Sequence, residues 1–442
     1  MKKLTLGLAL LAGAVVSHAA AGQPAATIVD ARTSAAVQQA VDKVAAEGGG
    51  TVFLPAGEYV MKSAVRLKSN VTLRGEGRAT VLKRVSFVQV ALTGDALKGA
   101  REVRVTGTAG FEEGMEVLCW DSVNFDSVTM DRSWAIVRKV EKDRVVLDRD
   151  LPHAYLVGKG AILTNAFYGI HGLEIAGARI VDLTIDGGFR DSERDFVFTE
   201  PGGYAGGGAY KTGHQQMGIQ FTDCTDCQVV NCRVFHCGGN GISASGGENI
   251  RFIGCDSFAN GWHGYHLGLS KQGATRCVMQ DCRAHHNAMV GVYVCWNVFE
   301  GVFIGNHVTD NSGDGFLIGP YDERNVFSGN IISRNGGCGI IAVRRAFAGR
   351  SNTFVDNIIS DNGVPGRTPA IWMQSPEDGI YEYYNFSRNL IVETRKVGAA
   401  NAAAILIDEK TDHISVADNI VQGPWRSAVE NRSAGKSNKI EE

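Results

Sequence analysis

The chain has 442 residues, with 44 lysines and arginines against 47 aspartates and glutamates, a formal charge of −3 and 44% hydrophobic residues. This balance excludes a nucleic-acid binder that depends on bulk positive charge, and it excludes a disordered chain. Glycine is frequent, at 55 residues, while proline is limited to 9. That composition is typical of many tight turns rather than of a low-complexity linker.

Residues 1–21 have the order of a secretory signal peptide. A basic start is followed by an apolar run from Leu4 to Val16 and then by small residues up to Ala21. The run is too short to cross a bilayer, and no later segment approaches the ~20 apolar residues that a spanning helix needs. We therefore expect a secreted or periplasmic protein without a membrane span.

Residues 33–46 carry the pattern of one amphipathic helix. Its apolar residues fall on a single face: Ala36, Val37, Ala40, Val41 and Val44. Thr33 or Ser34 can cap its first turn. Because the open end of a sheet exposes unpaired backbone, we expect this helix to cover such an end.

Residues 100–165 show a different pattern, with short runs of alternating apolar residues separated by turn signals, as in MEVLCW and RVVLDRD. Alternation of period two indicates strands. We therefore expect a small β-rich insertion here.

From residue 218 onward the sequence restarts at short intervals. The restarts are GIQF at 218, GISA at 241, GYHL at 264, GVYV at 291, GFLI at 315, GIIA at 339, AIWM at 370, AILI at 404 and AVEN at 428. The second and fourth residues of each are mostly apolar, which indicates a half-buried strand. A repeat of this length predicts stacked units with parallel strands rather than one layered core.

Two columns of small polar residues follow from aligning these units. One contains Cys232, Cys255, Cys282, Asn306, Asn330, Asn357, Asn389 and Asn419. The other contains Asn260, Asn287, Asn311, Asn335 and Asn362. Stacked asparagines can hydrogen-bond along the axis and tolerate left-handed backbone. We interpret the three cysteines as buried, reduced thiols rather than a metal site, and a Cys224–Cys227 disulfide stays open.

The chain resembles the right-handed parallel β-helix proteins of the pectate-lyase-like superfamily. The resemblance is carried by the repeat and by residues 48–77, GGGTVFLPAGEYVMKSAVRLKSNVTLRGEG, which look like the entry coil of that superfamily. It implies an all-β, right-handed parallel β-helix, a solenoid of about ten coils with an N-terminal capping helix. We expect the cap and first coils in 22–99, the insertion in 100–165 and the repeats in 166–442. The resemblance also implies a polysaccharide groove on the first strand face.

The third residue of each restart points outward on that face, which gives Gln220, Ser243, His266, Tyr293, Leu317, Ile341, Trp372, Leu406 and Glu430. GLEI at 172 is expected to add Glu174 beside Gln220. Neighbouring coils are ~4.8 Å apart, so Ser243, His266 and Tyr293 stand next to one another. We expect an exposed His266 whose pKa lies near working pH, which makes it the best acid or base.

Residues 187–217 are the longest break in the repeat and can wall this groove. The segment is Gly-rich, aromatic and acidic, and a loop of this length is more often functional than a bare connection. It carries Asp195, Tyr204 and His214. Solvated loop charge is a better interpretation of Asp195 and its acidic neighbours than a Ca²⁺ cluster, because the spacing matches no Ca²⁺ loop. We expect no cofactor, with Ca²⁺ as the alternative.

The polar set on the face suits proton abstraction beside a carboxylate. Elimination or epimerisation of a uronate needs a base, a donor for the leaving oxygen and a group that neutralises the carboxylate. His266 and Tyr293 fit the first two roles, and Lys271 is a candidate for the third. The catalytic candidates are His266, Tyr293, His263, His214 and Glu174. The substrate-binding candidates are Gln220, Ser243, Asp195, Tyr204, Lys271 and Trp372.

Two alternatives remain. Glu174 and an acid of the 187–217 loop could form the carboxylate pair of a glycoside hydrolase. A non-catalytic glycan-binding or structural β-helix is the other, because fold does not fix function. The chain lacks the NTD, DD, GHG and RIK series of polygalacturonases and the DPHD motif of alginate epimerases. We favour an enzyme acting on a polysaccharide or oligosaccharide, a lyase slightly before a hydrolase, while the sugar and the oligomeric state stay open.

Overall fold

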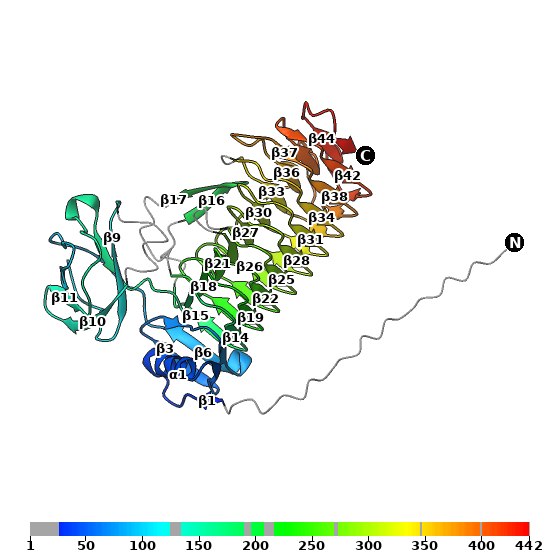
Figure 1. The fold of residues 1–442 in the computed structure, drawn as a ribbon. Coiled ribbons are helices and arrows are strands. Elements are labelled where there is room, and N and C mark those ends of the chain that lie inside the picture. Colours follow the sequence, from blue (N-terminus) through cyan, green and yellow to red (C-terminus); the bar gives the residue numbers. More distant parts are fainter. Residues whose placement is uncertain are drawn as a thin grey trace.

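Three long parallel sheets wind into a right-handed solenoid (Figure 1). The computed structural model describes residues 26–123, 134–189, 196–206, 216–268, 273–344, 347–397 and 400–441. The segment expected to be a signal peptide, residues 1–21, lies outside them. The all-β, parallel β-helix prediction is confirmed.

Each coil contributes one strand to each sheet. Sheet 1 contains β4 (Val65–Arg66), β13 (Ile170–Leu173), β18 (Ile219–Thr222), β21 (Ile242–Ser245), β24 (Tyr265–Leu267), β27 (Val292–Val294), β30 (Phe316–Ile318), β33 (Ile340–Ala342), β36 (Ile371–Met373), β40 (Ile405–Ile407) and β44 (Val429–Asn431). These strands follow the restarts of the sequence, so sheet 1 is the face on which the site is expected.

The other two sheets complete the coil. Sheet 2 contains β1 (Thr27–Ile28), β2 (Gly50–Phe53), β5 (Val71–Arg74), β14 (Arg179–Val181), β19 (Gln228–Val230), β22 (Arg251–Ile253), β25 (Val278–Gln280), β28 (Val302–Ile304), β31 (Val326–Ser328), β34 (Thr353–Val355), β38 (Asn385–Ser387), β42 (Ser415–Ala417) and β45 (Lys439–Ile440). Sheet 3 contains β3 (Gly57–Met61), β6 (Thr80–Arg84), β15 (Thr184–Asp186), β20 (Arg233–Phe235), β23 (Asp256–Phe258), β26 (Arg283–His285), β29 (His307–Thr309), β32 (Ile331–Ser333), β35 (Ile358–Ser360), β39 (Leu390–Val392) and β43 (Ile420–Gln422).

The solenoid interior is a stack of identical positions. Phe303, Phe327, Phe354 and Phe386 lie on successive strands of sheet 2, and their rings stack at centroid distances of 4.5 to 5.0 Å. Cys232, Cys255 and Cys282 are buried in one column. The Cys282 amide donates to Asn306 Oδ1 at 3.0 Å, where the asparagine part of that column begins. The predicted inward column is therefore confirmed.

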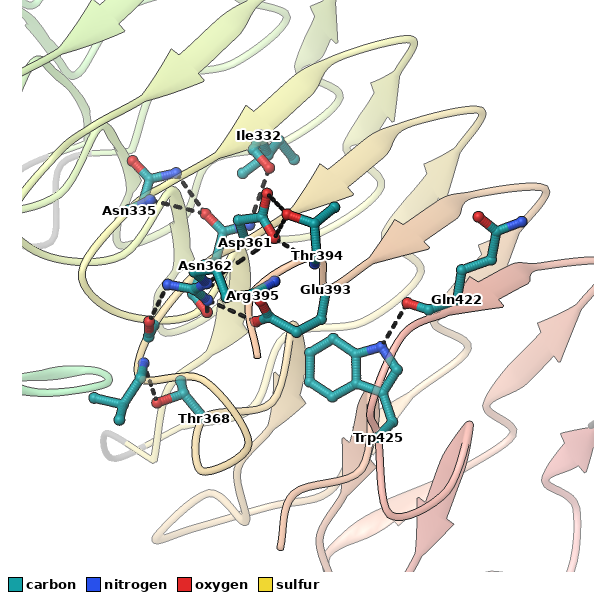
Figure 2. A network of polar contacts seen from close by, with 12 residues as sticks. Ile332, Asn335, Asp361, Asn362, Thr368, Glu393, Thr394, Arg395, Gln422 and Trp425 are labelled. Carbon is teal, nitrogen blue, oxygen red and sulfur yellow. Dashed lines mark hydrogen bonds and ion pairs between the residues drawn. The ribbon is translucent and has the colours of Figure 1, made fainter. Parts of the chain in front are cut away.

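The second asparagine column is also present. The Asn335 side-chain amide donates to Asn362 Oδ1 at 2.9 Å, and Asn362 Nδ2 donates to the Ile332 carbonyl at 2.9 Å (Figure 2). Asn362 is the last member of the column. The backbone carbonyl of Asn362 accepts from Arg395 Nη2 at 3.0 Å, and the same guanidinium forms an ion pair with Glu393. The carbonyl at the end of the column is therefore hydrogen-bonded to an ion-paired arginine and is not left without a donor.

The first end of the solenoid is covered as expected. Helix α1 (Ser34–Ala46) buries Val37, Ala40, Val41 and Val44 against the first coils, and the Thr33 hydroxyl accepts from the Ala36 amide at its N-cap. At the other end, β45 pairs with β42. The polar C-terminal segment therefore adds a strand to sheet 2, which its composition did not indicate.

A six-stranded antiparallel sheet projects from the solenoid (Figure 1). Its strands are β7 (Gln89–Ala91), β8 (Glu102–Arg104), β9 (Glu116–Trp120), β10 (Ala135–Val140), β11 (Arg144–Leu147) and β12 (Ile162–Thr164). β7 precedes the expected start at residue 100 because it pairs with β12, the last strand of the unit. We call this sheet the side sheet.

Candidate functional site

A column of polar side chains runs along the outer surface of sheet 1. Strand pairing places His171 beside Gln220, Gln220 beside Ser243, Ser243 beside His266 and His266 beside Tyr293. We call these five residues the polar column. Their backbones are about 4.8 Å apart from one strand to the next, so the five side chains form one continuous row. The predicted neighbourhood of Ser243, His266 and Tyr293 is confirmed.

The position predicted for Glu174 is wrong. His171 occupies the place beside Gln220, and Glu174 follows β13 as an exposed residue in left-handed backbone with φ of 53°. The strand begins with Gly169-Ile170-His171 rather than with Gly172, so the sequence register was displaced by three residues. Glu174 therefore does not stand in the polar column, and the motive for pairing it with a loop carboxylate is removed.

The centre of the polar column is buried rather than exposed. Gln220, Ser243 and His266 are 1%, 3% and 2% exposed. Gln220 Oε1, Ser243 Oγ and His266 Nε2 are buried atoms without a hydrogen-bond partner in the part of the chain that the structure describes. Buried polar atoms are almost always paired, so these three atoms on consecutive coils require polar partners that the described residues do not supply.

Burial changes the chemistry expected of His266. Desolvation lowers its pKa to about 3, so the ring is neutral at pH 7 and the predicted pKa near working pH is wrong. Its ring stacks on Tyr293 with centroids 4.7 Å apart and an interplanar angle of 10°. His263 and Trp262 surround the same ring, at 5.4 and 5.9 Å. His263 thus joins the site as predicted, and Trp262 is an addition.

The side sheet contacts the N-terminal end of the polar column, at His171. Arg66 pairs with His171 across β4 and β13, and its guanidinium donates to both carboxylate oxygens of Glu116 on β9, at 2.8 and 2.9 Å. The Arg66 guanidinium also lies 3.3 Å from the ring centre of Trp134. Burial, with a smaller effect of Arg66, lowers the pKa of His171 to about 3. None of Arg66, Glu116, Trp134 and His171 is among the predicted site residues. Only the repeated Gly-Ile start at 169 could have indicated His171.

A hairpin lies over sheet 1 (Figure 1). It consists of β16 (Phe196–Glu200) and β17 (Gly203–Gly206), and its tip amide at Gly202 donates to Asp314 Oδ2 at 2.9 Å. The Cys338 amide donates to the other oxygen at 2.7 Å. Burial raises the pKa of Asp314 to about 7. This hairpin belongs to the segment 187–217 that is predicted to wall the groove, and its tip lies at Asp314, just before β30, rather than beside Gln220 on β18.

An open pocket of about 510 Å³ lies beyond the hairpin tip. Its lining includes Glu200, Arg344, Trp372 and Gln374. The Trp372 indole donates to Asp408 Oδ2 at 2.9 Å, which holds the half-buried ring in place. Between this pocket and Tyr293 the column is apolar, with Leu317 and Ile341.

Some predicted site residues are beyond the described part of the chain. Asp195, His214 and Lys271 lie outside it, and so does the side chain of Tyr204, whose backbone belongs to β17. Within the described residues no group of three or more His, Cys, Asp or Glu side chains could hold a metal ion. No described helix is long and apolar enough to cross a membrane.

Two family models match the chain. Residues 260–421 match the model described as right-handed beta helix region, and residues 30–189 match the model described as rhamnogalacturonase A/epimerase, pectate lyase-like. The predicted resemblance to the right-handed parallel β-helix proteins of the pectate-lyase-like superfamily is confirmed over these two ranges. The matches cover both the entry coils and the repeats of this β-helix protein, and the second includes the side sheet.

Similar proteins point to the same fold. A segment of 69 residues is 44% identical to mannuronan C5-epimerase AlgE3 of Azotobacter vinelandii, covering 14% of this chain and 4% of that protein. The A-module of mannuronan C-5 epimerase AlgE4 of the same organism superposes with a TM-score of 0.56 at 17% identity, over 95% of this chain and 98% of that one. PfbA, a surface adhesin of Streptococcus pneumoniae, gives 0.55 at 12%, over 94% and 93%. Epimerases and an adhesin share the fold, so the fold leaves the activity of this β-helix protein open.

Proposed function

We propose that the protein is an enzyme that binds a uronate-containing polysaccharide along sheet 1 and cleaves it by β-elimination. One observation carries the proposal: three consecutive coils present buried, unpartnered polar atoms beside the stacked rings of His266 and Tyr293. A surface ladder with a purely structural role would have its polar atoms paired or in water. The apolar stretch and the Trp372 pocket extend the same face, as a long substrate requires.

The reaction needs three roles from the site. A base takes the proton from the carbon beside the carboxylate, the electron pair of that bond forms the C4=C5 double bond, and the glycosidic oxygen leaves C4 and receives a proton. A third group must stabilise the negative charge that builds up on the carboxylate. Ser243, His266 and Tyr293, on three adjacent coils, are the residues that we assign to these roles.

Epimerisation at the same carbon is the second candidate. It begins with the same proton abstraction, and it ends with return of a proton to the opposite face instead of loss of the glycosidic oxygen. The 44% identity to a mannuronan C5-epimerase over 69 residues favours it. A two-carboxylate hydrolase is not favoured at the polar column, because Glu116 is bound to Arg66 and Asp314 to two backbone amides.

The test separates these outcomes with one panel of polymers. Polymannuronate, polyguluronate, polygalacturonate and a neutral glucan are each incubated with the protein in D₂O. Elimination gives the ultraviolet absorbance of an unsaturated uronate together with new chain ends. Epimerisation gives deuterium at C5 without new ends, and hydrolysis gives new reducing ends without the absorbance. Activity on the glucan, or hydrolysis of any polymer, would overturn the proposal.

The matched control for the site is a histidine of the same solenoid. His307 lies outward and exposed on β29 of sheet 3, so His307→Gln changes the same residue type away from sheet 1. It is expected to keep the wild-type rate, whereas His266→Ala is expected to lose at least about 10²-fold, the effect of one group that stabilises transition-state charge.

A further inference from the structure

We propose that Asn240 is a positioning residue that holds the neutral His266 ring with its hydrogen on Nε2, so that His266 binds the substrate carboxylate instead of acting as the base. This inference rests on the proposed function for its chemical meaning. Its structural part, the position of one hydrogen, can be measured without any substrate.

The contacts of Asn240 determine which way its amide points. Asn240 is fully buried in the turn before β21, and its two side-chain polar atoms face two different neighbours. Oδ1 lies 3.3 Å from the backbone nitrogen of His263, and Nδ2 lies 3.1 Å from His266 Nδ1. A backbone N–H can only donate, so the amide oxygen must face His263 and the NH₂ group must face His266.

This orientation determines the tautomer of His266. The NH₂ group of Asn240 donates and has no lone pair to offer, so His266 Nδ1 must accept. In a neutral imidazole that accepts at Nδ1, the hydrogen is on Nε2. The opposite tautomer would place two N–H groups against each other at 3.1 Å in a buried site. Turning the Asn240 amide over would only move the same conflict to the His263 amide.

The result is a buried N–H that points to the ligand position. His266 Nε2 is one of the buried atoms without a partner in the described residues, and it lies beside the Ser243 hydroxyl on the preceding coil. The two residues stand on adjacent strands, whose backbones are about 4.8 Å apart, so their two donors suit the two oxygens of one carboxylate. These donors fill the role of carboxylate partner, for which the sequence suggested Lys271.

The assignment gives the stacked rings of His266 and Tyr293 different roles in the reaction. A neutral imidazole that donates from Nε2 has no lone pair at that atom with which to take a proton. His266 therefore stabilises charge on the carboxylate, as a neutral histidine can in a low-dielectric site. The base is then the phenolate of Tyr293, whose ring lies 4.7 Å from the imidazole; it takes the proton from the sugar carbon and, as the phenol so formed, gives it to the leaving oxygen.

The test is ¹⁵N NMR of the full-length protein labelled at histidine, with the His266 signals identified by their loss in His266→Gln. Long-range ¹H–¹⁵N correlations tell which ring nitrogen carries hydrogen. The wild type is expected to show hydrogen on Nε2 alone, without titration between pH 5 and 9. Asn240→Asp offers an acceptor to Nδ1, so it is expected to show hydrogen on Nδ1. A wild-type ring with hydrogen on Nδ1, or one that titrates in this range, would overturn the inference.

A binding measurement tests the role of the Nε2 hydrogen. Calorimetry compares a uronate oligosaccharide with the same oligosaccharide after reduction of its carboxylates to alcohols. Asn240→Leu, which removes both contacts to the ring, is expected to weaken binding of the uronate at least tenfold and to leave the reduced form within twofold. Equal weakening of both would overturn the carboxylate role. If the wild type shows the expected tautomer but acts on no uronate polymer, the proposed function fails while the tautomer assignment stands.

Discussion

Asn330 offers the most direct test of how the asparagine column stabilises the solenoid. Its Nδ2 donates to the Phe303 carbonyl at 3.0 Å and to Asn357 Oδ1 at 2.9 Å. Its Oδ1 accepts from the Asn306 backbone amide and from Asn306 Nδ2, both at 2.9 Å. The residue is 0% exposed, so water cannot replace these bonds.

Replacing Asn330 by alanine leaves one backbone group without a partner. This is the Asn306 N–H, since Asn306 Nδ2 keeps the Met279 carbonyl, Asn357 Oδ1 keeps the Asn330 amide, and the Phe303 carbonyl lies on β28 within the ladder to β31. An unpaired buried group costs about 1–3 kcal/mol, so the free energy of unfolding should fall by at least about that amount.

Urea unfolding followed by circular dichroism measures this loss. The matched control is Asn401→Ala, because Asn401 is exposed and its side chain makes no hydrogen bond within the described part of the chain, and such surface changes stay within about 0.5 kcal/mol. If Asn330→Ala shifted the urea midpoint no more than Asn401→Ala does, the column would not be a source of stability and the reasoning would be refuted.

Three further predictions concern charge, thiols and the distal pocket. The pKa of Asp314 is raised to about 7, so in the folded state this carboxyl keeps a proton that the unfolded chain loses near pH 4. The free energy of unfolding should therefore fall by up to about 4 kcal/mol as pH rises from 4 to 7. Asp314→Asn should remove this part of the pH dependence of the urea midpoint. Cys282, buried with a raised pKa, should react with iodoacetamide only in urea; labelling of the native protein, detected by mass spectrometry, would contradict its column position. Trp372→Ala should raise KM about tenfold for long oligosaccharides and leave disaccharides unchanged, and equal effects on both would exclude a distal sugar site.

The fold could be predicted because the solenoid repeats its local pattern. Each restart shows the same alternation, and identical positions such as Asn306 and Asn330 meet in space because the coil length is nearly constant. The helix at Ser34–Ala46 was also readable, since its cap and its apolar face lie within one short segment. Both features are local in the sequence or copied from coil to coil.

The register of the first repeat could not be decided from the sequence. Gly169-Ile170-His171 and Gly172-Leu173-Glu174 both offer a glycine followed by alternating residues. Only pairing of β13 with its neighbours selects the first, and that pairing involves residues about fifty positions further along the chain. The sequence therefore predicted Glu174 at the position beside Gln220 that His171 occupies.

The burial of His266 depends on parts of the chain that are distant in sequence. Its alternating position predicted an exposed side chain, which is correct for an uncovered sheet. The His266 ring contacts Tyr293 on the following coil, 27 residues away, and the side-chain amide of Asn240, 26 residues away. No local pattern encodes such contacts, so the lowered pKa of His266 could not be foreseen.

The central claim, that the polar column on sheet 1 eliminates uronate polymers, is tested most directly by the absorbance of unsaturated uronate formed by wild type and His266→Ala. Circular dichroism and the urea midpoint establish first that the variant is folded at the assay temperature. The account predicts product with at least one of polymannuronate, polyguluronate and polygalacturonate, a rate at least about 10²-fold lower for His266→Ala, and a wild-type rate for His307→Gln. A folded His266→Ala with the wild-type rate on a polymer that the wild type cleaves would contradict it.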